Sequence, residues 1–217
     1  MTRVISIVSL GEGTGKTTLA LNLGLVLHDM NHRVLVFDTD FTKKNMMEHL
    51  DILGLPINIG NVLNGEAHIN DSVYRHITGL KIIPSAIHGY ENFSYNFPSL
   101  LGDYDYIILD TPKDQPYLDI VLKNSTEAII IHSPKYSSKL VLDTIDLLQR
   151  HKLVNLGIVL NGVLDDSVDE IFGIPVIEKI PKHKDIEKSF SLKNPVVHTH
   201  PRSEVSKRFK RLGKKLS

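Results

Sequence analysis

Short apolar runs alternate with segments of helical periodicity along most of this chain. The runs are rich in Val, Ile and Leu without polar alternation, which is typical of parallel strands covered on both faces. The predicted strands are 4–8, 34–37, 81–83, 106–109, 128–131, 157–160 and 175–178. The segments of helical period are 17–30, 139–151, 185–190 and 203–216. This alternation predicts an α/β fold with a doubly wound, mostly parallel sheet and helices on both faces.

The chain shows no internal repeat and no shift of composition that marks a domain boundary. The segment 60–96 is the least regular, with Gly, Asn, Pro and Ser scattered through it. A length of 217 residues suits one sizeable domain with a real core. We therefore expect a single domain over 1–217 that ends in a basic amphipathic helix at about 203–216.

Composition and charge exclude several classes of protein. Hydrophobic residues make up 41% and charged residues 23%, which is ordinary for a globular protein. Lys+Arg and Asp+Glu both total 25, so bulk charge favours no class of partner. The lack of cysteine excludes disulfide frameworks, Cys-ligated clusters and Cys nucleophiles. No apolar run approaches the roughly 20 residues of a membrane span, and the N-terminus lacks a signal-peptide layout. We expect a cytoplasmic protein.

A glycine-rich stretch follows the first predicted strand and precedes a helical pattern. It consists, in order, of Gly11, Glu12, Gly13, Thr14, Gly15, Lys16, Thr17 and Thr18. Backbone N–H groups of such a turn, with the positive end of the next helix, bind anions. The lysine can reach terminal phosphates, and the following Thr hydroxyl can ligate Mg²⁺. This context predicts a phosphate-binding loop, although Leu10 stands where the usual form has Gly. An ordinary tight turn is the alternative.

Carboxylates follow two of the other predicted strands. Asp38 and Asp40 come directly after 34–37, and Asp110 follows 106–109. Ligands of doubly wound sheets bind at the carboxyl ends of the strands, where acids can hold the water shell of Mg²⁺ or orient an attacking water. The alternative is that each Asp begins a turn or caps a helix. Two acids at the end of one buried strand favour a nearby cation.

Taken together, these segments resemble the MinD/ParA family of deviant-Walker-A P-loop ATPases, and the MinD branch most. The residues that carry the resemblance are the loop, 18–24, 38–42 with Asn45, 105–112, 157–161 and 195–197. It covers nearly the whole chain. The resemblance implies a P-loop NTPase fold, ATP and Mg²⁺ as ligands, and a switch whose ATP hydrolysis organises the position of a partner or of the cell-division machinery.

The resemblance also implies roles for individual residues. The nucleotide-binding residues would be Gly11, Glu12, Gly13, Thr14, Gly15, Lys16, Thr17, Thr18, Asn45 in a switch segment, and Asn161 at the adenine base. The catalytic residues would be Lys16 and Asp40, with Asp40 orienting the attacking water. The Mg²⁺ site would be formed by Thr17, Asp38 and Asp110. From the residues alone, Asn161 in its Asn-Gly pair also fits an ordinary turn.

The chain departs from the family pattern at the loop and shortly after Asp110. Gly11 stands where the family has a second lysine that reaches across a nucleotide-sandwiched homodimer, and Glu12 replaces a Gly. Lys113 and Asp114 replace an Ala-Gly pair. Loss of a charge-stabilising cation lowers rates of phosphoryl transfer by orders of magnitude. We therefore expect hydrolysis that is slow or waits for a protein partner.

Two other functions stay open at this point. One is a non-hydrolysing ATP-binding regulator with a decayed loop, and the other is a ParA-like DNA-partition protein. Three lysines are candidates to replace the missing cation: Lys43, Lys44 and Lys113.

The last segment is strongly basic. From 201 onward it holds seven Lys or Arg against the single acid Glu204, and Val205, Phe209, Leu212 and Leu216 form one stripe of a helix. A basic amphipathic helix can lie on anionic lipid at the membrane periphery or contact nucleic-acid phosphates. The alternative, which we favour, is that the stripe packs on the protein core while the basic side chains stay solvated.

Overall fold

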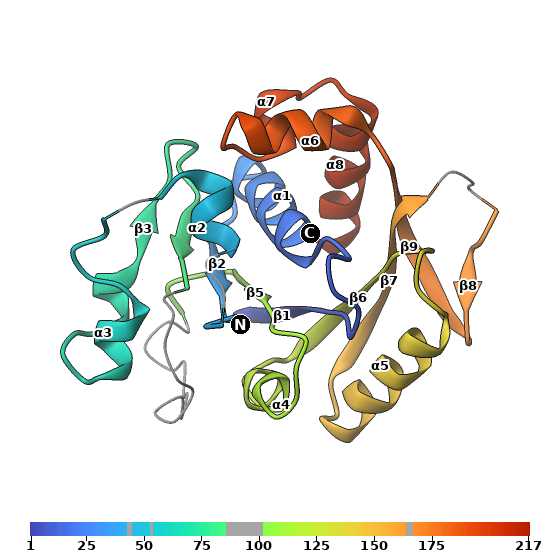
Figure 1. Cartoon of the computed structure of the whole chain (residues 1–217), viewed down its shortest axis with the longest axis horizontal. Helices are drawn as coiled ribbons and strands as arrows, with labels where there is room; N and C mark the ends of the chain where they lie inside the picture. Colours follow the sequence, from blue (N-terminus) through green and yellow to red (C-terminus); the bar gives the residue numbers. More distant parts are fainter. Residues whose placement is uncertain (43–44, 53, 86–101, 164–166) are drawn as a thin grey trace.

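The computed structural model describes residues 1–42, 45–52, 54–85, 102–163 and 167–217. Within them, nine strands form one sheet in the order β3-β4-β2-β5-β1-β6-β7-β9-β8 (Figure 1). The strands are β1 (Arg3–Val8), β2 (Val34–Asp38), β3 (Tyr74–Arg75), β4 (Lys81–Ile83), β5 (Tyr106–Asp110), β6 (Glu127–His132), β7 (Val154–Val163), β8 (Glu170–Ile171) and β9 (Ile174–Pro181). All neighbours pair in parallel except the short edge strands β3 and β8, which are antiparallel to β4 and β9. The predicted α/β sheet is confirmed.

Helices cover both faces of the sheet. They are α1 (Lys16–Asp29), α2 (Asn45–Leu50), α3 (Ile59–Leu63), the 3₁₀ turn η1 (Ile69–Ser72), α4 (Tyr117–Leu122), α5 (Lys139–Arg150), α6 (Lys184–Ser191), α7 (Val196–Thr199) and α8 (Glu204–Leu216). Figure 1 shows α1, α6, α7 and α8 on one side of the sheet and α4 and α5 on the other. Successive β1 side chains serve different core clusters: Ile5 and Ile7 join the α1 and α8 side chains, whereas Val8 joins those of α4 and α5.

The seven predicted strands and four predicted helices are all present, with ends displaced by a few residues. The structure adds elements that are too short to leave a periodic pattern: α2, α3, α4, α7, η1, β3 and β8. Part of the irregular segment 60–96 contains α3, η1, β3 and β4. The remainder of that segment, from 86 onward, lies outside the described residues.

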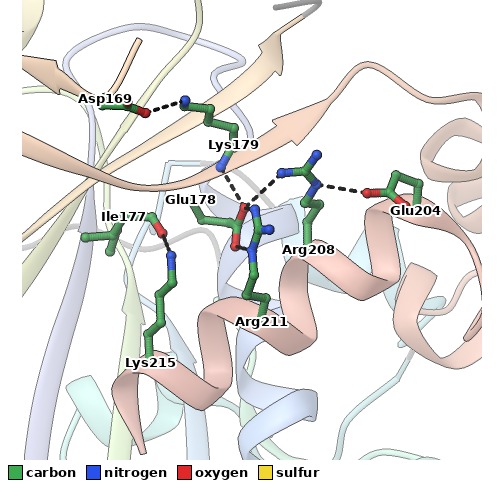
Figure 2. Close-up of polar contacts among 8 residues, drawn as sticks. All are labelled: Asp169, Ile177, Glu178, Lys179, Glu204, Arg208, Arg211 and Lys215. Carbon is green, nitrogen blue, oxygen red and sulfur yellow. Dashed lines mark hydrogen bonds and ion pairs between the residues drawn. The ribbon is translucent and has the colours of Figure 1, made fainter. Parts of the chain in front are cut away.

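The basic C-terminal helix packs on the core, as favoured above. Its apolar stripe is buried, with Val205, Phe209 and Leu212 at most 1% exposed and Leu216 at 8%. On its polar side, Arg208 and Arg211 contact Glu178 of β9 (Figure 2). The α8 helix is therefore held by both an apolar and an ionic interface. No helix in the described part of the chain combines the length and apolar character needed to cross a bilayer.

Candidate functional site

The glycine-rich loop joins β1 to α1. Gly15 has φ of 98°, and a Cβ added to it would lie 2.4 Å from Asn161 Nδ2, so both conformation and space require glycine here. Gly15 is also the N-cap of the 14-residue helix α1. Because a glycine N-cap has no side-chain acceptor, the first N–H groups of α1 are left to bind an anion, which the helix dipole favours.

A cavity of about 440 Å³ opens at this loop. Its lining includes the predicted site residues Glu12, Gly13, Thr14, Gly15, Lys16, Thr17, Thr18, Asp40, Asp110 and Asn161. The carboxyl ends of β1, β2, β5 and β7 therefore meet where the sequence pattern placed a ligand site. A cavity of this size is within the range of small-molecule sites.

Asp110 and Thr17 form the central polar contact of the cavity. The Thr17 hydroxyl donates a hydrogen bond to Asp110 Oδ2 at 2.6 Å. Burial raises the pKa of the Asp110 carboxyl to about 6, although the Thr17 hydrogen bond and the charge of Lys16 lower it. A cation at this hydroxyl would offset the desolvation of the carboxylate.

Asp38 lies beside Asp110, because β2 and β5 pair in register at these two residues. Its side chain is fully buried and accepts hydrogen bonds from Ser85 Oγ at 2.9 Å, Asp40 N at 3.1 Å and Met46 N at 3.3 Å. Burial, followed by the charge of Asp110, raises the pKa of Asp38 well above its ordinary value. Two buried carboxyl groups side by side are an environment that a divalent cation stabilises.

The oxygen atoms of Thr17 and Asp110 fit a Mg²⁺ ion whose other ligands are water molecules and phosphate oxygens. Among the described residues, no group of three or more His, Cys, Asp or Glu side chains converges on one metal position. Mg²⁺ does not need such a cage, because it usually keeps several waters and binds through one or two protein oxygens together with substrate phosphates. Thr17 Oγ1 and the adjoining Asp110 carboxylate match that requirement.

Asp40 both faces the ligand site and begins a turn, the two roles that its sequence position allowed. It lines the cavity, and its Oδ1 also accepts hydrogen bonds from Thr42 N at 3.2 Å and Thr42 Oγ1 at 2.5 Å. The carboxylate thus stabilises the turn after β2 while facing the site. Its role in orienting water stays a prediction.

Asn161 lies within β7 rather than in a turn. It pairs with Ile180 of β9, and its side-chain Nδ2 donates to Thr14 O at 2.7 Å. The amide therefore braces the glycine-rich loop from the β7 side of the cavity. Contact with an adenine base stays a prediction.

Some predicted residues are not brought into the cavity. Among the described lining residues Gly11 and Asp38 do not appear. Gly11 donates its N–H to Ser9 Oγ at 3.2 Å, and a Cβ added to it would lie 2.9 Å from the Thr14 methyl and 3.1 Å from the Tyr136 ring. Tyr136, on the segment after β6, thus fills the space next to Gly11.

Three of the predicted residues have side chains outside the described part of the structure. Asn45 begins α2, but its side chain is not among the described atoms. Lys43 and Lys44 lie outside the described residues. Lys113, the other candidate cation, does line the cavity.

Four lining residues were missed by the sequence analysis: Thr111, His49, Ile186 and Phe190. His49 of α2 and Phe190 of α6 meet edge to face with ring centroids 4.6 Å apart. The helical segment 185–190 was predicted, but nothing local in it indicates that it closes over a loop more than 150 positions earlier. Thr111 could have been found, because it directly follows Asp110.

Comparison with known proteins agrees with this geometry. Residues 5–196 match the CobQ/CobB/MinD/ParA nucleotide binding domain. The septum site-determining protein MinD of Pyrococcus horikoshii, solved with Mg-ADP, is 28% identical with a TM-score of 0.89, over 100% of this chain and 96% of that one. An uncharacterised ATP-binding protein of Methanocaldococcus jannaschii is 26% identical over 100% of this chain and 88% of its own length.

A sporulation initiation inhibitor protein, Soj of Bacillus subtilis, is 28% identical over 84% of this chain and 80% of its own length. The family match spans most of the chain, and the MinD structure reproduces its whole fold. The resemblance inferred from the sequence is confirmed. The chain belongs to the CobQ/CobB/MinD/ParA nucleotide-binding family.

Proposed function

We propose that this protein is a MinD/ParA-type switch that binds Mg-ATP and hydrolyses it slowly or on stimulation by a partner. The observation that carries the proposal is the 2.6 Å hydrogen bond from Thr17 to Asp110 in a cavity lined by the start of α1. It aligns a hydroxyl ligand with a carboxylate next to a helix N-terminus. The MinD structure with Mg-ADP supports the same ligand for this fold.

The residues of the cavity have separate tasks in this proposal. The N–H groups of the loop and the Lys16 ammonium bind the phosphates. Thr17, with Asp110 and Asp38 acting through water, would hold Mg²⁺, which neutralises phosphate charge and fixes the phosphate oxygens. Asp40 orients the attacking water. Ile186 and Phe190 add apolar surface to the cavity.

The loop itself supports slow turnover. The second loop lysine of the family is absent, and the space beside Gly11 is taken up by Tyr136. A transition state of phosphoryl transfer loses much of its stabilisation when one cation is missing. The output we propose is an ATP-dependent change of conformation or a homodimer that positions an unidentified protein partner.

Calorimetry with the purified chain tests ATP binding directly. We expect Mg-ATP and Mg-ADP to bind, and Lys16→Ala to abolish binding of both without loss of folding. Lys123→Ala is the matched control, because this exposed lysine lies at the end of α4. Wild-type protein that bound neither nucleotide, or binding that survived Lys16→Ala unchanged, would refute the proposal.

Turnover and particle mass separate the proposed switch from its alternatives. A switch hydrolyses ATP and changes mass or shape between Mg-ATP and Mg-ADP, measured by light scattering after size exclusion. A non-hydrolysing regulator shows no phosphate release with any addition. Stimulation by DNA would favour the partition protein, and stimulation by liposomes would favour peripheral membrane binding. Both depend on the exposed basic side of α8.

A further inference from the structure

An acid from the glycine-rich loop and a lysine from the segment after β5 meet at the cavity. Glu12 belongs to the glycine-rich loop, and Lys113 follows β5 by three residues. Their Oε2 and Nζ atoms are 3.4 Å apart, and both residues line the cavity. Asp114 Oδ1 lies 4.0 Å from the same ammonium group. The ion pair thus connects the phosphate loop to the segment that follows the Asp110 strand.

The pair is weak enough to be exchanged. The side chains of Glu12 and Lys113 are 59% and 35% exposed, and exposed ion pairs contribute little to stability. A polyphosphate in the same cavity presents several negative charges to Lys113 and repels Glu12. The lysine therefore gains more from a phosphate oxygen than it loses by leaving the carboxylate.

Lys113 lies near the proposed Mg²⁺ ligands, where the terminal phosphate of a nucleotide would be bound. It lies on the Asp110 side of the cavity, where the proposed Mg²⁺ ligands are, whereas Asn161 braces the loop from the β7 side. Lys135 also touches the loop, through Gly13 O at 3.2 Å, but it is outside the described cavity lining. Among the described lining residues, Lys16 and Lys113 are the lysines.

From this geometry we propose that Lys113 is a second phosphate-binding lysine, that Glu12 holds it when no phosphate is bound, and that a nucleoside triphosphate takes its ammonium group from Glu12. The proposal rests on the nucleotide binding proposed above. It makes Glu12 a competitor of the terminal phosphate, and it makes the segment after β5 responsive to the number of phosphates.

A set of variants measured by calorimetry tests each part of this proposal. The probes are the Mg²⁺ complexes of the non-hydrolysable β,γ-imido analogue of ATP and of ADP. Lys113→Gln should weaken the triphosphate about tenfold, the effect of one charge-assisted hydrogen bond, and ADP by less than about twofold. Lys113→Arg should restore triphosphate binding. Glu12→Gln should tighten the triphosphate about threefold, and this gain should vanish in the double variant.

Matched controls exclude a general effect of surface charge. Lys123→Gln, at the C-cap of α4, and Asp146→Asn, in α5, change exposed residues and should leave both affinities unchanged. Equal losses for the two nucleotides in Lys113→Gln, or a Glu12→Gln gain that persists without Lys113, would overturn the inference. If wild-type protein binds no nucleotide, the proposed function fails; if it binds through Lys16 but ignores Lys113, only this inference fails.

Discussion

Replacing Glu178 by Gln tests how the C-terminal helix is held on the sheet. The Glu178 side chain is 0% exposed, and it accepts a hydrogen bond from Arg211 Nε at 2.6 Å while Arg208 Nη1 lies 3.6 Å away (Figure 2). Gln keeps the volume but removes the charge that balances these guanidinium groups. The substitution therefore isolates the ionic part of the α8 interface.

The expected loss follows from burial. Breaking a fully buried ion pair destabilises by about 3–5 kcal/mol. Arg211 is 52% exposed and can be rehydrated, so we expect about 2 kcal/mol for Glu178→Gln. For a chain of this length that lowers Tm by about 4–8 °C. Urea unfolding followed by circular dichroism measures the change in the free energy of unfolding, and a thermal scan measures the change in Tm.

Asp169→Asn is the matched control, because Asp169 pairs with Lys179 at 2.8 Å but is 90% exposed. It should change the free energy of unfolding by about 0.5 kcal/mol or less. Equal effects of the two substitutions would refute the reasoning, since burial would then not decide the strength of the pair.

The same pair has a defined pH dependence. Burial raises the pKa of Glu178, but the hydrogen bonds from Arg211 and from Lys179 N outweigh burial and leave the pKa below its ordinary value of 4.5. A lowered carboxyl pKa stabilises the fold above the unfolded pKa and loses this effect as pH falls through the folded pKa. The difference between wild type and Glu178→Gln should be full at pH 7 and shrink below about pH 4.5. A constant difference down to pH 3 would show that shape, not charge, is responsible.

Three further substitutions test the core, the loop and the metal site. Phe209→Ala should cost about 3–5 kcal/mol because Phe209 is 1% exposed, whereas Lys210→Ala on the exposed side should be near neutral in the same urea assay. Gly11→Ala should destabilise by about 1–3 kcal/mol because the added Cβ would crowd the Thr14 methyl and the Tyr136 ring, and by less in a Tyr136→Ala background, where only the Thr14 contact remains. Asp110→Asn should weaken nucleotide binding in Mg²⁺ but leave metal-free binding unchanged, as calorimetry with and without EDTA would show.

Local patterns were sufficient to predict the strands, the loop and the strand-end acids that form the site. Apolar runs located the parallel strands, and the Gly-Lys-Thr-Thr sequence located the loop because its chemistry lies within eight consecutive residues. Asp38 and Asp110 were found from their places at strand ends, and their adjacency follows from the pairing of β2 with β5. The order of the strands is a tertiary property, however, and only the structure reveals it.

Contacts between distant segments could not be predicted from the chain alone. Phe190 reaches the cavity because α6 lies on the same side of the sheet as α1 (Figure 1), and Tyr136 fills the space at Gly11 because the end of β6 lies next to β1. The Glu178–Arg211 pair joins two elements through side-chain geometry that periodicity does not encode. The basic helix illustrates the same limit, because its stripe was visible in the sequence whereas the surface that covers it was not.

The contrast between two polar contacts indicates where nucleotide can act on this protein. The Thr17–Asp110 hydrogen bond is short and involves an Asp110 that is 2% exposed. It is therefore formed before any ligand binds, and ligand binding need not rearrange these two side chains. The Glu12–Lys113 pair is longer, and its side chains are 59% and 35% exposed, so it yields to a stronger anion. A change that depends on the number of phosphates should therefore begin at the Glu12–Lys113 pair, and hydrogen exchange of the segment after β5 should differ between the triphosphate and diphosphate complexes.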